Sequence, residues 1–281
     1  MIIAITGASG FIASSVRKMM KTEGAEYIPL KRDEPDEIWE YKLMKAQVVI
    51  NLAGAPVIQR WTKKNKAHIL NSRVHTTKRL VTILNRIQNA PELMISASAI
   101  GIYPDKGNEI MTESSLQTGD SFLSEVVKKW ELAASELSNS AVRLVIARIG
   151  VVIGKDGGLL KKTLPLFILG LGGKIASSKQ ALSFIHIEDI VRAFQFFIEN
   201  RNTNGIFNLA APNITTNAEF TRALAKAVKR PAFFTVPAFA LKLLYGKAAQ
   251  IMINGEKVYP KRLLEEGFEF KYATIESALN E

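Results

Sequence analysis

The chain has 281 residues, of which 47% are hydrophobic, and its formal net charge is +11 at pH 7. This apolar content supports a substantial core and excludes a disordered chain. Because the sequence has no cysteine, it excludes disulfides, cysteine nucleophiles and cysteine-ligated metals; no metal site is expected either, since His68, His75 and His186 lack the spacing of a metal-binding helix.

The first predicted unit is a strand, a tight turn and a helix at the start of the chain. The apolar run Ile2 to Ile5 is typical of a buried parallel strand, and a helix is expected from Phe11. Gly7 allows the chain to reverse sharply, Gly10 lets a pyrophosphate approach the backbone, and Ala13 lets the helix pack close to the strand. Because the N–H groups and the dipole at a helix start favour a phosphate, this unit predicts a dinucleotide-binding loop.

The second predicted strand, Glu26 to Leu30, is followed directly by Lys31 and Arg32. An acidic residue at this place would accept the ribose hydroxyls of NAD, whereas an arginine accommodates the 2′-phosphate of NADP and can pair with it through two hydrogen bonds. Asp33 lies one residue further along. We therefore expect NADP(H) to be preferred over NAD(H), with Lys31 and Arg32 in the site; the alternative is that both are solvated surface residues.

Three further strands and two long amphipathic helices follow in alternation. The strands are expected over residues 47–52, 92–97 and 142–147, and the helices carry apolar faces within 69–87 and 122–137. This alternation predicts an α/β fold, a Rossmann-type doubly wound parallel sheet, whose ligand lies at the carboxyl ends of the strands.

The pattern loosens after the fifth strand. A sixth strand is expected over Leu182 to Ile187, with helices over residues 190–199 and 218–228. Residues 1–229 are predicted to form the dinucleotide-binding domain, with substrate-lobe elements from about residue 150 onward. Residues 230–281, which are rich in Pro, Phe and Lys, are predicted to form a smaller C-terminal α/β lobe.

Much of the positive charge lies in one stretch. Between Tyr41 and Pro91 there are ten Lys or Arg residues and no Asp or Glu. A basic stretch can bind nucleic acid, but the basic stripe with interleaved aromatic residues that marks such a site is missing. A positive field that attracts a polyanionic dinucleotide is a sufficient explanation, so no nucleic-acid partner is expected.

The apolar stretches predict no membrane segment. The longest, Ala232 to Leu244, is interrupted by Pro237 and Lys242 and cannot span a bilayer. No secretory signal is visible, because the first apolar run is short and is followed by glycines. We therefore expect a cytoplasmic protein without a membrane partner.

Small and polar residues stand at the ends of the third and fourth predicted strands. Asn51-Leu52-Ala53-Gly54 would let the adenine side of a dinucleotide lie against the backbone, and Ser96, Ala97 and Ser98 end the next strand. On the helix between them, Arg73 projects from an apolar face. It either extends over that face to solvent or reaches a phosphate or an anionic substrate, which would place it in the cofactor site.

These motifs resemble those of the extended short-chain dehydrogenase/reductase superfamily. The loop from Thr6 to Ile12 is similar to its cofactor loop, and Asn51 to Gly54 is similar to its Asn-x-Ala-Gly signature. The resemblance implies that Ser98 hydrogen-bonds the reacting carbonyl or hydroxyl, with Ser96 as the alternative. The cofactor-binding residues implied in this way are Gly7, Ser9, Gly10, Phe11, Ile12, Asn51, Leu52, Ala53, Gly54, Ser96 and Ala97.

The Tyr and Lys on which the superfamily's proton transfer depends are absent. In that superfamily a Lys four residues after the Tyr favours the phenolate. Aligning Glu131 with the Glu that follows this pair places Leu123 at the Tyr position and Val127 at the Lys position, and neither side chain can transfer a proton. Lys128 and Lys129 are expected on a solvated face of the helix.

Several motifs together are similar to an atypical subgroup, the "epimerase family" proteins, also described as cell-division-inhibitor-like. The motifs are Asn51 to Pro56, Arg60-Trp61-Thr62, Ser72-Arg73-Val74, Phe122 to Glu131, Arg148 to Gly154 and Phe184 to Asp189. The tail resembles the small C-terminal domain of that subgroup, whose role is unassigned. Its matching segments are Pro237 to Phe239, Val258 to Lys261 and Leu264 to Phe270.

Two functions are compatible with these features. The first is an NADP(H)-dependent oxidoreductase or epimerase acting on an unidentified carbonyl or hydroxyl substrate. In it Ser98 orients the substrate, and Tyr103, Glu113 or a water donates the proton; the other interpretation of Tyr103 is a packed aromatic residue. The second function is a non-catalytic dinucleotide-binding sensor or interaction protein. His186 is expected to make a structural hydrogen bond, and by analogy with the superfamily a homodimer is expected.

Overall fold

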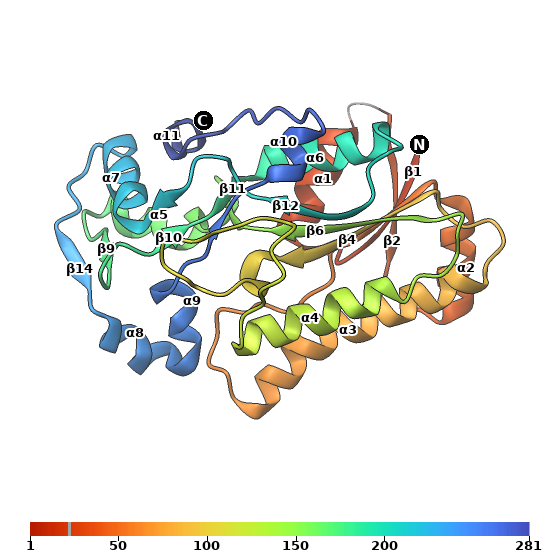
Figure 1. Cartoon of the computed structure of the whole chain (residues 1–281), viewed down its shortest axis with the longest axis horizontal. Helices are drawn as coiled ribbons and strands as arrows, with labels where there is room; N and C mark the ends of the chain where they lie inside the picture. The colour runs from red at the N-terminus through yellow and green to blue at the C-terminus, as the bar shows by residue number, and fades with distance from the viewer. Residues whose placement is uncertain (22–23, 281) are drawn as a thin grey trace.

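A six-stranded parallel sheet forms the centre of the molecule, of which the computed structural model describes residues 1–21 and 24–280 (Figure 1). Its strand order is β12-β6-β4-β3-β1-β2. These strands are β1 (Ile2–Thr6), β2 (Glu26–Leu30), β3 (Val48–Asn51), β4 (Leu93–Ala99), β6 (Arg143–Ile149) and β12 (Gly205–Leu209). The chain moves outward from β1 in both directions, and the crevice at such a reversal is where α/β folds bind ligands.

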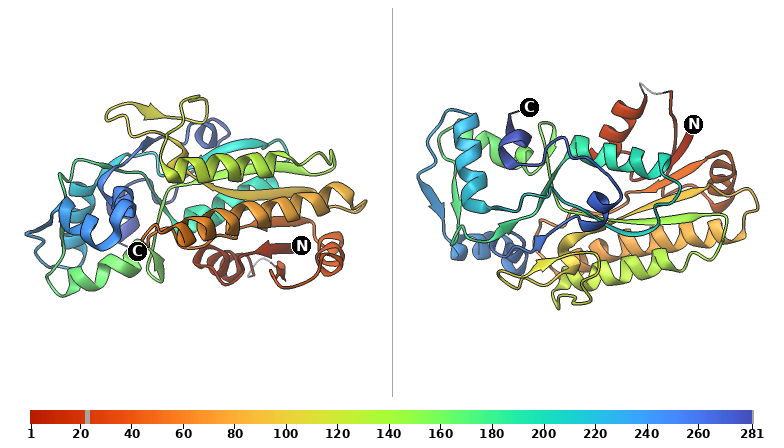
Figure 2. Two further views of the ribbon diagram at one scale, coloured as in Figure 1. Left: turned by 90° about the horizontal axis from the view of Figure 1, so that it is seen from below. Right: turned by 45° about the horizontal axis from the view of Figure 1, so that its top comes forward.

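Helices cover both faces of the sheet, which confirms the predicted Rossmann-type α/β fold. One face carries α1 (Phe11–Lys21) and α6 (Ile187–Glu199), and the other carries α2 (Asp36–Lys45), α3 (Lys63–Arg86) and α4 (Phe122–Ser135), as Figures 1 and 2 show. The strands β1, β3 and β4 are buried almost throughout, because side chains on both faces meet helices.

The sixth strand of the sheet is β12, and the sixth strand predicted over Leu182 to Ile187 is present only in part and lies outside this sheet. That segment is split into two short strands that join other sheets. They are β10 (Ala181–Leu182), which pairs with β13 (Thr215–Thr216), and β11 (Phe184–His186), which pairs with β7 (Val151–Gly154).

Ser183 lies at the split. Its hydroxyl donates a hydrogen bond to the carbonyl of Glu256 and accepts one from the N–H of Val258, so this point of the chain is tied to the C-terminal segment. The strand β12 was missed because it starts at Gly205, with φ at 77°, and carries the buried polar Asn208. An apolar pattern alone does not mark such a strand.

The remaining short elements lie mostly at one end of the molecule. They are η1 (Ile100–Ile102), β5 (Ile110–Met111), β8 (Gly157–Gly158), α5 (Leu160–Ile168), β9 (Gly173–Ile175), α7 (Asn217–Ala227), β14 (Phe234–Val236), α8 (Ala238–Tyr245), η2 (Gly246–Ala249), α9 (Gln250–Ile253), β15 (Lys257–Val258), α10 (Lys261–Glu265) and α11 (Ile275–Leu279). The C-terminal segment pairs with earlier parts of the chain, β14 with β9 and β15 with β5. The predicted boundary at residue 230 stays a prediction.

Polar contacts at several points fix the C-terminal segment to the sheet domain. The carboxylate of Asp189, at the start of α6, accepts hydrogen bonds from the N–H groups of Lys271 and Tyr272. The Arg60 guanidinium donates to the carbonyls of Leu243 and Leu244 at the end of α8. Within the described part of the chain, no helix has the length and apolar character needed to cross a bilayer.

Candidate cofactor and active site

The turn between β1 and α1 has the geometry that a bound pyrophosphate requires. Gly7 has φ at 66°, and a Cβ there would lie 2.7 Å from the carbonyl oxygen of Leu52. The N–H of Gly10 donates to Gly7 O at 2.9 Å and closes the turn. At the helix start, the N–H groups of Phe11 and Ile12 have no acceptor in the described chain, and the first turn carries no acidic residue. These donors are therefore available to an anion.

The Phe11 ring occupies a space that two glycines provide. A Cβ at Gly157 would lie 2.3 Å from this ring, and one at Gly154 would lie 2.9 Å from it. Both glycines belong to the β7–β8 hairpin, so the glycine-rich stretch after β6 serves to seat the first residue of α1. The side chain of Phe11 thus packs against protein, and only its backbone faces the turn.

Arg32 follows the end of β2 on a loop that neighbouring side chains hold in place. The Arg79 guanidinium donates to the carbonyls of Arg32 (3.1 Å) and Glu34 (2.5 Å) and to Asp36 Oδ1 (2.7 Å), and lies 4.2 Å from the centre of the Trp39 ring. Trp39 Nε1 in turn donates to the carbonyl of Lys31. The guanidinium of Arg32 itself is exposed and makes no hydrogen bond or ion pair in the described chain.

A cavity of about 700 Å³ joins the turn, the end of β2 and the end of β3. Its volume lies in the range of ligand-binding clefts. The lining residues are Thr6, Gly7, Ala8, Ser9, Gly10, Pro29, Leu30, Lys31, Arg32, Asp33, Trp39, Leu52, Ala53, Gly54 and Thr76. Eight predicted cofactor residues are thus brought together here. Phe11, Ile12, Asn51, Arg73, Ser96 and Ala97 are not among the lining residues.

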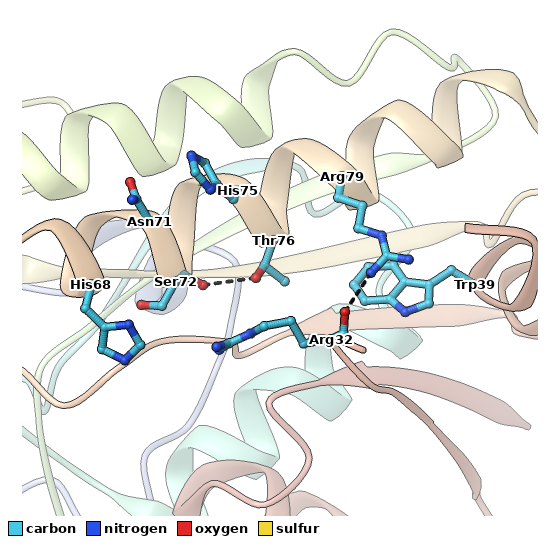
Figure 3. A pocket seen from close by; sticks show the side chains of 8 residues that line it. All are labelled: Arg32, Trp39, His68, Asn71, Ser72, His75, Thr76 and Arg79. Carbon is cyan, nitrogen blue, oxygen red and sulfur yellow. Dashed lines mark hydrogen bonds between the residues drawn. The ribbon is translucent and has the colours of Figure 1, made fainter. Parts of the chain in front are cut away.

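A second cavity of about 340 Å³ shares Arg32, Trp39 and Thr76 with the first. Figure 3 shows Arg32 extending beneath α3 towards His68 and Ser72, while Arg79 lies over Trp39. The shared wall means that Arg32 stands between the two spaces. Apart from Ser72, the residues that α3 contributes here (His68, Asn71, His75, Thr76 and Arg79) were not predicted, because helix periodicity marks only the buried face.

Asn51 organises the ends of three strands from inside the protein. Its side chain is fully buried, accepts a hydrogen bond from the Thr6 hydroxyl at 2.7 Å, and donates to the hydroxyls of Thr77 (2.8 Å) and Ser96 (3.3 Å). The Thr6 hydroxyl also accepts from the N–H groups of Leu52 and Ala53. Asn51 and Ser96 therefore hold the backbone that lines the cavity.

Arg73 lies in an apolar environment close to the cavity wall. Its Nη1 donates to the carbonyls of Ala55 (3.0 Å) and Ile69 (3.1 Å), and its guanidinium lies 5.2 Å from the centre of the Trp130 ring. No carboxylate pairs with it in the described chain, and burial lowers its pKa to about 10. A Cβ on Gly54 would lie 2.9 Å from Arg73 Cζ, so Gly54 is the point where the arginine approaches the cavity.

The two predicted catalytic residues lie at opposite ends of one buried polar network. Ser98 Oγ donates to Glu131 Oε1 at 2.5 Å, and Arg148 binds both carboxylate oxygens of Glu131 at 2.8 Å. Arg148 also donates to the Tyr103 hydroxyl at 2.7 Å, which contacts Asn208 Oδ1 at 2.9 Å. The network links β4, α4, β6 and β12. The catalytic role of Ser98 and Tyr103 stays a prediction.

Charge within this network is balanced. Burial alone would lower the pKa of Arg148, but the hydrogen bond and the negative charge of Glu131 raise it above its ordinary value. Burial raises the pKa of the Tyr103 phenol, against the opposing influence of Arg148. Tyr103 is 2% exposed, so its hydroxyl is a neutral hydrogen-bonding group inside the protein.

Leu123 and Val127 stand where the resemblance places them, on the first turns of α4. Leu123 Cβ would lie 3.9 Å from a Cβ on Gly101, just beyond the end of β4 that carries Ser98. Val127 is buried in an apolar cluster. Lys128 pairs with Glu125 on the helix surface, and Lys129 is exposed. The structure therefore supplies no lysine at the place where the superfamily has one.

Two other residues with predicted roles are engaged by the fold. His186 Nδ1 accepts a hydrogen bond from the N–H of Glu188 at 3.3 Å, and its ring lies 3.9 Å from that of Tyr272, which confirms a structural role. The Glu113 carboxylate accepts from the N–H groups of Asn208 and Arg262, and burial raises its pKa. It thus ties the loop after β5 to β12 and α10.

The carboxyl group of Glu256, which the sequence analysis did not identify, should make the protein less stable as the pH rises. Burial, together with the charge of Asp105, raises the pKa of its carboxyl to about 7. An unfolded chain ionises this group near its ordinary pKa, so the stability of the protein falls as the pH rises from about 4.5 to 7.

We expect Glu256→Gln to remove a destabilisation of about 2 kcal/mol at pH 8 in urea unfolding and to change the stability little at pH 5. Glu276→Gln, at an exposed site, is the control, and an equal gain at both pH values would contradict the assignment.

The N-terminal and C-terminal parts of the chain match two sequence families. Residues 3–210 match the NAD dependent epimerase/dehydratase family, and residues 236–281 match a domain of unknown function, DUF1731. The chloroplastic homolog of the epimerase family protein SDR39U1 from Arabidopsis thaliana is 34% identical over 299 residues, which cover 99% of the chain and 86% of that protein. The epimerase family protein YfhF of Bacillus subtilis is 32% identical, covering 99% of the chain and 97% of that protein.

A solved human structure is similar to this protein over the whole chain. The crystal structure of the human epimerase family protein SDR39U1 (isoform2) with NADPH superimposes with a TM-score of 0.94 at 29% sequence identity. The match covers 100% of this chain and 98% of the human one. The similarity therefore includes both the sheet domain and the C-terminal segment.

Proposed function

Because the chain belongs to the NAD dependent epimerase/dehydratase family, we propose that it binds NADP(H) and uses it in oxidoreductase or epimerase chemistry on a carbonyl or hydroxyl substrate. The observation that carries the choice of NADP(H) is the free guanidinium of Arg32, placed at the end of β2 between two cavities. The human relative that is similar over its whole length was crystallised with NADPH, which supports the same choice.

The residues of the larger cavity fit the parts of this cofactor. The free N–H groups of Phe11 and Ile12 would hold the pyrophosphate, and the main chain of Leu52 to Gly54 would lie against the adenosine. Arg32 would pair with the 2′-phosphate. When bound, the nicotinamide supplies or accepts the hydride.

Ser98 is the side chain that we assign to the substrate. Its proton is directed at the Glu131 carboxylate, so Oγ offers lone pairs to an incoming hydroxyl. In the oxidation direction the substrate hydroxyl gives its proton to Ser98 Oγ while Ser98 passes its own proton to Glu131. Arg148 orients the Glu131 carboxylate for this transfer through two hydrogen bonds. This relay would replace the absent Tyr and Lys.

Ser98→Ala tests turnover separately from cofactor binding. With NADPH oxidation followed across a panel of aldehydes and ketones, we expect kcat to fall about 100-fold while NADPH affinity is unchanged, because only the proton relay is lost. Ser135→Ala, on the exposed side of α4, is the control. Tight NADPH binding without turnover of any carbonyl would favour the alternative, a dinucleotide-binding sensor.

We expect Arg73→Met to raise the stability of the protein and to weaken its binding of NADPH. The arginine is partly buried without a carboxylate partner, so an apolar side chain of similar length should raise the free energy of unfolding of the cofactor-free protein by about 1 kcal/mol. If its charge serves the cofactor beside Gly54, the same variant should bind NADPH about tenfold more weakly. Urea unfolding and a binding titration measure the two effects. A variant that is less stable and binds NADPH normally would assign Arg73 a purely structural role.

A further inference from the structure

Ten large apolar side chains are exposed on neighbouring elements of the end lobe formed by α5, β9, α7, β14 and α8. Phe233 is 87% exposed, and Phe239 and Leu243 are each 73% exposed. We call this set, with the basic residues named below, the basic apolar face. Its apolar members are Leu166, Ile168, Leu169, Leu171, Phe233, Phe234, Val236, Phe239, Leu243 and Leu244. Exposed apolar surface of this extent marks an interaction site.

The pairing of the strands places these elements next to one another. The end of α5 leads through Leu169 and Leu171 into β9, and β9 pairs with β14, with Gly173 opposite Phe234. Pro237 then connects β14 directly to α8. Figures 1 and 2 show α5, β9, β14 and α8 together at the end of the molecule that lies away from the N-terminus.

The charged side chains of the segments that carry this face are all positive. Residues 157–187 and 220–255 contain no Asp or Glu. All ten of their Lys and Arg residues are exposed, and none forms an ion pair in the described chain. These ten are Lys161, Lys162, Lys174, Lys179, Arg222, Lys226, Lys229, Arg230, Lys242 and Lys247. At the edge, the carboxylate of Glu219 is engaged by the N–H and hydroxyl of Thr216.

We propose that the basic apolar face binds the surface of a bilayer that contains anionic phospholipids. Exposed Phe and Leu side chains next to lysines are what such a surface attracts, because the apolar groups enter the headgroup boundary and the charges meet anionic lipids. The helix α8 has only eight residues, so it lies at the interface and does not cross the bilayer.

Two other partners fit the same face less well. Seven of the ten apolar side chains are aliphatic, and these neither stack on nucleic-acid bases nor bond phosphates. A second copy of the chain would bring positive charge against positive charge across a two-fold axis. The sequence analysis predicted no membrane partner because Pro237 and Lys242 interrupt the apolar run from Ala232 to Leu244, so that this run cannot span a bilayer. That argument did not consider binding to the surface of a bilayer. The exposure of the side chains in this run was not visible from the sequence.

Sedimentation with lipid vesicles tests the proposal on the full chain. The probes are vesicles of phosphatidylcholine alone and of phosphatidylcholine with about one-third phosphatidylglycerol. We expect partition to the anionic vesicles to be at least about tenfold stronger, and to be largely lost in about 0.5 M salt. The double variants Phe239→Ser/Leu243→Ser and Lys242→Glu/Lys247→Glu should each lower partition about tenfold or more. All four of these side chains are exposed, so circular dichroism and NADPH affinity should stay unchanged.

A matched control separates this face from exposed apolar residues in general. Leu116 and Leu132 are 96% and 64% exposed on the sheet domain, and Leu116→Ser/Leu132→Ser should leave partition unchanged. Equal partition to neutral and anionic vesicles, or no partition to either, would overturn the proposal. So would a concentration-dependent dimer, seen in analytical ultracentrifugation and abolished by Phe239→Ser/Leu243→Ser, without vesicle binding. NADPH binding is measured in parallel, and its failure would leave this proposal untouched.

Discussion

Arg32→Ala is expected to weaken NADPH binding about 100-fold while changing NADH binding less than about twofold. The guanidinium lies free at the end of β2, and the 2′-phosphate is the group that distinguishes the two cofactors. Two charge-assisted hydrogen bonds to a phosphate contribute about 3 kcal/mol, which corresponds to that factor. A fluorescence titration of both cofactors against wild type and variant measures it.

The control for this experiment is Arg17→Ala, which removes an exposed arginine from the outer side of α1. It should lower the affinity for both cofactors slightly and equally, since it changes only the general field. An equal loss of NADPH and NADH affinity in Arg32→Ala would show that this side chain acts through the general electrostatic field or through the stability of the fold. In that case Arg32 would not bind the 2′-phosphate specifically.

Glu131→Ala is expected to destabilise the protein by about 3–5 kcal/mol, the largest effect that we predict for a single substitution. The carboxylate binds Arg148 through two hydrogen bonds and accepts a third from Ser98. Its removal leaves the guanidinium buried without a counter-charge and leaves the hydroxyl of Ser98 without its acceptor. The midpoint of urea unfolding reports the loss, with the slope of the transition as a check on two-state behaviour.

Glu125→Ala is the matched control on the same helix, because its ion pair with Lys128 is on the surface. We expect a much smaller change there, because solvent screens an exposed ion pair. If Glu131→Ala cost no more than Glu125→Ala, the buried network would not be the element that holds α4 against β4 and β6. The substrate role that we assign to Ser98 would then lose its support as well.

The parts of the fold that could be predicted are those with a local physical signal. Ile2 to Ile5 is apolar because a parallel strand is buried on both faces, and Gly7 is needed because its φ is positive and Leu52 O lies close by. The end of β2 at Leu30 was predicted correctly. The prediction that Lys31 and Arg32 follow this strand therefore identified two residues that line the cavity. Each of these features follows from neighbours in the sequence.

What could not be predicted depends on contacts between distant segments. The strand β12 is stabilised by Asn208, which binds Tyr103 and the carbonyl of Tyr259. Arg79 holds the loop of Arg32 from a helix more than forty residues away, at three positions that no periodicity reveals. A polar residue buried by a remote partner looks like a surface residue in the sequence.

The network around Ser98 shows the same limit at the site itself. The sequence placed Ser98 and Tyr103 as candidates and noted the missing Tyr and Lys. That Glu131 and Arg148 together connect Ser98 to Tyr103 follows only from the packing of α4 on β4 and β6. The resemblance indicated which residues are missing, and the structure shows which residues stand near their places.

A titration of the wild-type protein with NADPH and with NADH tests the central claim most directly. The cavity and its free arginine predict that NADPH binds at least about tenfold more tightly than NADH, with the preference reduced at high salt. Binding of neither cofactor would contradict the proposed function, and equal or stronger binding of NADH would contradict the role given to Arg32.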